Sequence, residues 1–211
     1  LRLSQRCPQC TDIVRVLDLG ANVDSTAEHL VQFARMGSIL SQCIDGIASP
    51  KVALLNIGEE DIKGNEQIKA AAELLKAQTD VNYIGFVEGD GIAKGEADVV
   101  VCDGFVGNVM LKSIEGTARM ISHMIKQQIN KNWLTRFLAL FALPVWVGLK
   151  SELNPSKYNG ASLVGLKGIV VKSHGGTDVL GFTTALTLAI HEVEKDIPGL
   201  IAQKFDTAEI S

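Results

Sequence analysis

Short runs of β-branched and aliphatic residues alternate with helical patterns along this chain, and this alternation restricts the fold more than any other feature. Continuous Val, Ile and Leu runs are typical of parallel strands that are covered on both faces. The sequence therefore predicts an α/β fold with three layers, in which helices pack on both faces of a mostly parallel sheet. The predicted strands lie within residues 13–23, 50–58, 81–89, 98–102 and 167–176, and the predicted helices within 25–44, 65–78, 109–130 and 178–197.

Length and composition fit one globular domain. The chain has 211 residues, of which 46% are hydrophobic and 21% are charged, and its formal net charge is −4. A negative chain without a basic patch is not expected to bind nucleic acid. The first ten residues have no apolar centre of the kind that a signal peptide needs, so a cytoplasmic location is expected.

The four cysteines suit a reducing compartment. Cys43 and Cys102 lie in apolar patterns, where a free thiol usually packs as a small hydrophobic group. Cys7 and Cys10 form a CxxC pair, but a structural zinc site needs a second pair of ligands and the sequence offers none. No metal and no cofactor are therefore predicted.

Four polar loops follow predicted strands. They read DLGANVD, NIGEEDIKGNE, CDGFVGN and KSHGGTD. In open parallel sheets, ligands bind beyond the carboxyl ends of the strands, so the four loops are predicted to share one edge and to form a site. Each loop taken alone is explained better by turns and helix caps, and it is the four loops together that favour a site.

The chemistry available in these loops points to a small anion. Lys63 precedes a helix, where its charge and the free N–H groups could hold a phosphate. Lys172 and His174 alternate near a strand end, so their side chains are predicted to face the same side. Asp103 and Asn108 bracket a glycine-rich turn, where they could orient a polar substrate or cap the next helix.

Residues 133–149 are almost entirely apolar, but the run is interrupted by Arg136 and Pro144 and is too short to span a membrane. It is predicted to be a buried hairpin or a dimer contact. Alternatively it contacts lipid or an acyl chain, because Trp133 and Trp146 flank it as interfacial residues do.

The motifs LDLGANVD, LLNIGEEDIKGNE, VVVCDGFVGNVMLKSIEG and GIVVKSHGG resemble, in order and spacing, the bacterial phosphate acyltransferases of phospholipid synthesis, the PlsX family. The resemblance covers about residues 14–195. It identifies residues 1–211 as a single α/β domain that corresponds to the C-terminal portion of the family's fold, with a helical, apolar insertion at 115–160.

The resemblance implies transfer of a long-chain acyl group from acyl carrier protein to inorganic phosphate. It also implies a fold like that of isopropylmalate dehydrogenases and phosphotransacetylases, a homodimer, and peripheral membrane contact through 133–149. The family's motif residues include Lys172, His174, Asn108 and Asp103, and their side-chain chemistry makes these four the candidate catalytic residues, with none singled out as the decisive one. The implied substrate-binding residues are Asn22, Asp24, Asn56, Glu59, Lys63, Gly64, Asn65, Glu66, Gly104, Gly107 and Gly175.

Two other functions fit the same residues. A metal- and NAD-dependent hydroxy-acid dehydrogenase of the related fold would need carboxylate ligands, which Glu59 and Glu66 could supply, although carboxylates in a helix's first turn are also ordinary partners of the helix dipole. A non-catalytic module that binds acyl carrier protein would need only part of the site.

Overall fold

The main sheet of the computed structural model is mostly parallel, as predicted. The structure describes residues 2–4, 13–152 and 154–208, so Cys7 and Cys10 lie outside the described residues. The strand order is β1-β2-β5-β3-β4, in which β1 alone runs antiparallel to its neighbour. The strands span Arg2–Ser4 (β1), Ile13–Leu17 (β2), Lys51–Leu55 (β3), Asn82–Val87 (β4) and Val99–Val101 (β5).

Alternating strand residues are buried on opposite faces of this sheet. On one face, Val52 and Leu54 pack with helices α1 (Ala27–Leu40) and α2 (Glu66–Lys76). On the other face, Ala53 packs in a second cluster with residues of α3 (Gly89–Lys94) and Met110 of α4 (Gly104–Ile129). Both faces are covered, which confirms the three-layer α/β prediction.

The helices differ from the sequence prediction at several places, among them the start of α4, the short helix α3, and the end of the predicted closing helix at 178–197, where a separate helix begins at Ile197. Helix α4 begins at Gly104 rather than at Val109, because the Asp103 carboxylate accepts a hydrogen bond from the Val106 amide and caps the helix there. The glycine-rich turn predicted between Asp103 and Asn108 is therefore wrong, and these residues form the first turns of α4. Helix α3 was not predicted, since its six residues are too few for a periodic pattern.

The C-terminal part forms a separate small layer. A two-stranded antiparallel ribbon pairs β6 (Ala161–Ser162) with β7 (Val171–Lys172), after the 3-10 turn Pro155–Tyr158. The loop KSHGGTD thus leaves this ribbon and not the parallel sheet, so the prediction that four loops share one sheet edge is wrong for this loop. Helices α7 (Val179–Glu194) and α8 (Ile197–Ala208) follow, and α8 packs on α1 through Ile197 and Ile201.

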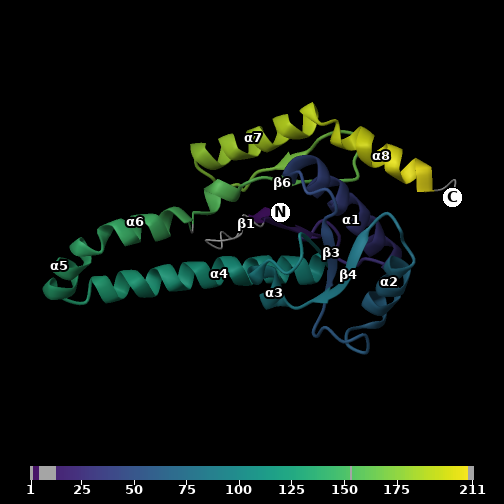
Figure 1. Ribbon diagram of the computed structural model, residues 1–211. Helices are drawn as coiled ribbons and strands as arrows, with labels where there is room; N and C mark the ends of the chain where they lie inside the picture. The colour runs from purple at the N-terminus through teal and green to yellow at the C-terminus, as the bar shows by residue number, and fades with distance from the viewer. Residues whose placement is uncertain (1, 5–12, 153, 209–211) are drawn as a thin grey trace.

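A helical arm projects from this body. It consists of the second half of α4, then α5 (Trp133–Phe141) and α6 (Leu143–Glu152), and Figure 1 shows α5 at its tip. We call residues 116–152 the arm. Within the described residues no helix is long and apolar enough to cross a membrane.

The prediction of a buried hairpin at 133–149 is wrong in this chain, because the large apolar side chains of α5 and its neighbours face solvent. The exposed ones include Met120, Met124, Trp133, Phe137, Leu138, Leu140, Phe141, Val145 and Val147.

Candidate functional site

A cavity of about 510 Å³ lies between β2, helix α1, helix α4 and the β6–β7 ribbon. Its lining brings together polar residues from three of the four loops, namely Asn22 from the first, Asn108 from the third, and Lys172 with His174 from the fourth. A volume of this size is typical of a site for a small molecule. Its apolar lining includes Phe33, Met36, Leu40, Leu163, Val164 and Leu188.

The first loop is folded around the carboxylate of Asp18. The two carboxylate oxygens accept hydrogen bonds from the backbone amides of Gly20 (2.9 Å), Ala21 (2.7 Å) and Asn22 (2.8 Å). They also accept one from the side-chain amide of Asn22, at 2.7 Å. The loop therefore has a fixed shape, and Asn22 is held at the cavity with one side-chain N–H already bonded.

This loop packs directly on the first turns of α4. A Cβ atom at Gly104 would overlap the carbonyl oxygen of Asn22, and one at Gly107 would overlap the carbonyl oxygen of Asp18. Both glycines are buried, so they serve the close approach of two backbone segments. That approach places exposed Asn108 beside the first loop, where a Cβ at Gly20 would lie 3.2 Å from the Asn108 Cβ.

Asn159 organises the fourth loop, which carries Lys172 and His174. Its side-chain oxygen accepts from the His174 backbone amide at 3.0 Å, and its amide group donates to Ser173 Oγ at 2.8 Å and to the Gly181 carbonyl at 2.9 Å. The Gly176 amide donates to His174 Nδ1 at 3.2 Å. A neutral His174 in this arrangement carries its proton on Nε2, which leaves that nitrogen as a hydrogen-bond donor.

Lys172 is the cation best suited to bind a negative group in the cavity. Its side chain is exposed, and no ion pair of Lys172 is found among the described residues. The other cations of the lining already have partners, since Arg15 pairs with Asp45 and Lys112 pairs with Glu115 at 3.0 Å. Lys172 can therefore accept an anion without first losing a carboxylate.

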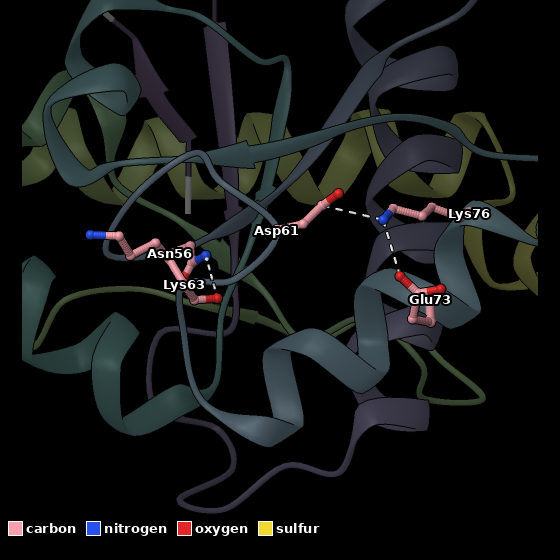
Figure 2. A network of polar contacts seen from close by, with 5 residues as sticks. All are labelled: Asn56, Asp61, Lys63, Glu73 and Lys76. Atoms are coloured by element: carbon pink, nitrogen blue, oxygen red, sulfur yellow. Dashed lines mark hydrogen bonds and ion pairs between the residues drawn. The ribbon is translucent and has the colours of Figure 1, made fainter.

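The second loop has its own internal structure and does not line the cavity. The Asn56 side chain donates to the Lys63 carbonyl at 3.3 Å, and Gly64, with φ of 91°, lies against Asn56. Asn65 caps α2, and Glu66 pairs with Lys69. Figure 2 shows the Lys63 side chain directed away from the Asp61–Lys76–Glu73 network.

These contacts account for Asn56, Gly64, Asn65 and Glu66 by turn and cap geometry. Glu59 and Lys63 are exposed. The loop still leaves the same sheet edge as the first and third loops, because β3, β5 and β2 are parallel neighbours. A substrate contact by this loop stays a prediction.

Five more predicted residues lie outside the cavity lining, namely Asp24, Asp103, Gly104, Gly107 and Gly175. Asp24 and Gly175 are exposed, and neither belongs to the residues that surround the cavity. Conversely, sequence reasoning did not select Asp18, Asn159 or Lys112. Asp18 carried a usable signal, since it directly follows a strand and precedes Gly20 as a loop-binding carboxylate often does.

The thiol beside the first loop is not a nucleophile at neutral pH. Burial raises the pKa of Cys102 to about 12, with a further contribution from the charges of Asp103 and Asp18. Its Sγ–H donates to the Asp18 carbonyl at 3.3 Å. Among the described residues no group of three or more His, Cys, Asp or Glu side chains could hold a metal ion.

Comparison with known proteins decides the family. The sequence model of a family described as "Fatty acid synthesis protein" matches residues 3–199. The chain belongs to this family. The match confirms the resemblance carried by the four motifs and places all three cavity-forming loops within the family's sequence.

Curated relatives in the family carry the name phosphate acyltransferase. The protein of Alcanivorax borkumensis is 59% identical over 195 residues, which are 92% of this chain and 58% of that protein. Those of Methylococcus capsulatus and Legionella pneumophila are 57% and 53% identical, over 93% and 91% of this chain and 58% and 56% of theirs. The chain spans a little over half the length of these relatives.

Proposed function

We propose that this chain contributes the phosphate and thioester site of an acyltransferase that moves a long-chain acyl group from acyl carrier protein to inorganic phosphate. The acyl phosphate formed would serve phospholipid synthesis. The observation that supports this most is the convergence of Lys172, His174, Asn108 and Asn22 on one cavity in a chain whose relatives are named phosphate acyltransferases.

The reaction does not require a nucleophile from the protein. A phosphate oxygen attacks the thioester carbonyl carbon, the carbonyl oxygen becomes an oxyanion, and the C–S bond then breaks to release the carrier's thiolate. The protein must hold phosphate beside the thioester and donate hydrogen bonds to the oxyanion. The buried, protonated Cys102 thiol fits this scheme, since no cysteine acyl intermediate is required.

The predicted catalytic residues each have a place in this chemistry. The Lys172 ammonium, which has no carboxylate partner in the described chain, would bind phosphate. His174 Nε2–H and the Asn108 amide are the donors for the oxyanion. Asp103 acts indirectly, because it caps and so fixes the start of the helix that carries Asn108.

The enzyme is also proposed to be cytoplasmic and to associate with the membrane surface through the arm. Between residues 116 and 151 the sequence contains no Asp or Glu but five basic residues, namely Arg119, Lys126, Lys131, Arg136 and Lys150. Exposed apolar side chains at 133–147, in a segment whose charged residues are all basic, fit contact with anionic lipid. We further propose that the family's homodimer uses part of the same exposed surface.

The test is release of free acyl carrier protein from its acyl thioester, with and without phosphate. It should be run with this chain and with a chimera that adds the remaining portion of a full-length relative. Phosphate-dependent release by either protein supports the proposal. Release by the chimera alone would assign essential groups to the added portion. Carrier binding without release by either protein would instead indicate a carrier-binding module and would contradict the acyltransferase proposal.

A further inference from the structure

Asp18 is a buried carboxylate that the sequence motifs did not single out, and its side chain is the most heavily bonded in the candidate site. The residue is 8% exposed. Its two oxygens accept four hydrogen bonds, at 2.7 to 2.9 Å, three from the backbone amides of residues 20–22 and one from the Asn22 side chain. Hydrogen bonds to an ionised carboxylate are stronger than those between neutral groups.

The backbone of Asp18 is fixed as firmly as its side chain. Its amide donates to the Cys102 carbonyl at 3.1 Å, and its carbonyl accepts from Cys102 Sγ and lies against Gly107. The backbone of Asp18 is therefore held by Cys102, which directly follows β5, and by the first turn of helix α4. Since α4 also carries Asn108, the same packed segments set the positions of Asn22 and Asn108 at the cavity.

The same bonds limit what the first loop can do. Successive backbone amides in a glycine-rich loop commonly form an anion-binding nest, but here the Asp18 carboxylate already occupies that nest. The loop amides are thus unavailable to phosphate. What the loop still offers the cavity is the Asn22 side chain, with its oxygen and its second N–H.

We propose that Asp18 is a positioning residue, whose carboxylate fills the nest of the first loop and thereby holds the Asn22 side-chain amide toward the substrate. The part that concerns substrate rests on the proposed acyltransferase function. In this arrangement the first loop orients the thioester or the oxyanion through Asn22, while phosphate is bound by Lys172 of β7.

The first experiment measures the loop itself and needs no turnover. Amide hydrogen exchange of residues 20–22 is compared in the wild-type chain, in Asp18→Asn and in Asp90→Asn, a surface Asp-to-Asn control. Asparagine has one acceptor oxygen in place of two, so Asp18→Asn should reduce protection of these amides at least about tenfold. The control should leave their protection unchanged. Equal protection in wild type and Asp18→Asn would overturn the proposal.

The second experiment asks whether Asp18 acts through Asn22. In the active protein, either this chain or the chimera, Asp18→Asn should lower kcat roughly 10- to 100-fold with little change in the KM for phosphate, because orientation is lost and not phosphate binding. The double variant, Asp18→Asn with Asn22→Ala, should have a kcat less than about twofold below that of Asn22→Ala alone. Equal losses in both backgrounds would show a merely structural role and overturn the proposal.

Asn22→Ala covers the case in which Asp18→Asn does not fold. This variant keeps the carboxylate and its three backbone partners, so it should reproduce the loss of kcat while Gly20 and Ala21 stay protected. Normal turnover in Asn22→Ala would overturn the proposal. If neither the wild-type chain nor the chimera shows phosphate-dependent release, the acyltransferase function fails, and the exchange measurement still decides whether Asp18 holds the loop.

Discussion

At the scale of single residues, Lys172 is the side chain on which the proposed chemistry depends most. We expect Lys172→Met to lower phosphate-dependent turnover by roughly 100-fold or more, because the cavity would lose the cation that we propose binds phosphate. The matched control is Lys167→Met, at an exposed position between β6 and β7, and this variant should keep activity. Unchanged turnover of Lys172→Met in the acyl-carrier-release assay would remove Lys172 from the mechanism.

The Cys102 thiol should be unreactive toward alkylating reagents in the folded protein. Because burial raises the pKa of its thiol to about 12, only about one molecule in ten thousand carries the thiolate at pH 8. Iodoacetamide should therefore leave Cys102 unmodified in the native chain and label it in denaturant, as peptide mass spectrometry can show. Equal labelling rates in the two states would contradict the packing of Cys102 against the first loop.

Glu192 should make stability depend on pH. Burial raises the pKa of this carboxyl above its ordinary value of 4.5, although its hydrogen bond from Ser162 and the charge of Arg15 act in the opposite direction. The folded state then keeps a proton that the unfolded state has lost, so stability falls as pH rises from about 4.5 through the raised pKa.

Glu192→Gln keeps the shape of the side chain and removes the titration. Relative to wild type, this variant should become progressively more stable between pH 4.5 and pH 8, as measured by urea unfolding at several pH values. Parallel pH profiles for the two proteins would show that Glu192 does not titrate in this range.

At the scale of elements, the contact between the first loop and α4 depends on two glycines. Gly107→Ala would force its methyl group into the Asp18 carbonyl, so it should destabilise the fold by about 1–3 kcal/mol or more. Gly116→Ala on the same helix meets no atom within 4 Å. This control should be neutral or stabilise by up to about 1 kcal/mol. Thermal unfolding separates the two outcomes, and equal effects would contradict the close approach.

Element-level prediction from sequence succeeded where periodicity and caps act locally. Thr26 and Asn65 cap α1 and α2 close to the positions that the patterns indicate, and the buried strands β3 and β5 match their aliphatic runs. Prediction failed where a contact between residues distant in sequence determines the local structure. Gly104 and Gly107 look like turn residues, but the Asp103 cap and the first loop hold them in a helix.

At the scale of the whole molecule, the arm should govern contact with lipid. The chain should float with vesicles that contain anionic lipid and much less with zwitterionic ones, because binding combines apolar burial with the attraction of the basic residues. Phe137→Glu with Phe141→Glu should abolish flotation, whereas Ile57→Glu, an exposed apolar position on the body, should not. Sedimentation of the same variants reports whether the arm also mediates self-association.

The molecule-level arrangement was only partly predictable. The order of strand and helix patterns indicated the α/β class, since parallel strands must be connected by crossovers. No pattern indicated that β6 and β7 leave the main sheet, or that Asp18 would organise the first loop, because both depend on tertiary packing. The apolar run at 133–149 predicted burial or contact equally well, and only its exposure on the arm excludes burial within this chain.

Helix α4 is continuous from the cavity to the base of the tip, and it therefore sets the distance between them. Asn108 and Ile129 are 21 positions apart on one helix, which corresponds to about 32 Å at 1.5 Å per residue. An uninterrupted helix behaves as a stiff spacer. With the tip on a bilayer, the reacting groups would stand at a fixed height above the lipid headgroups, within reach of a carrier arriving from the aqueous side.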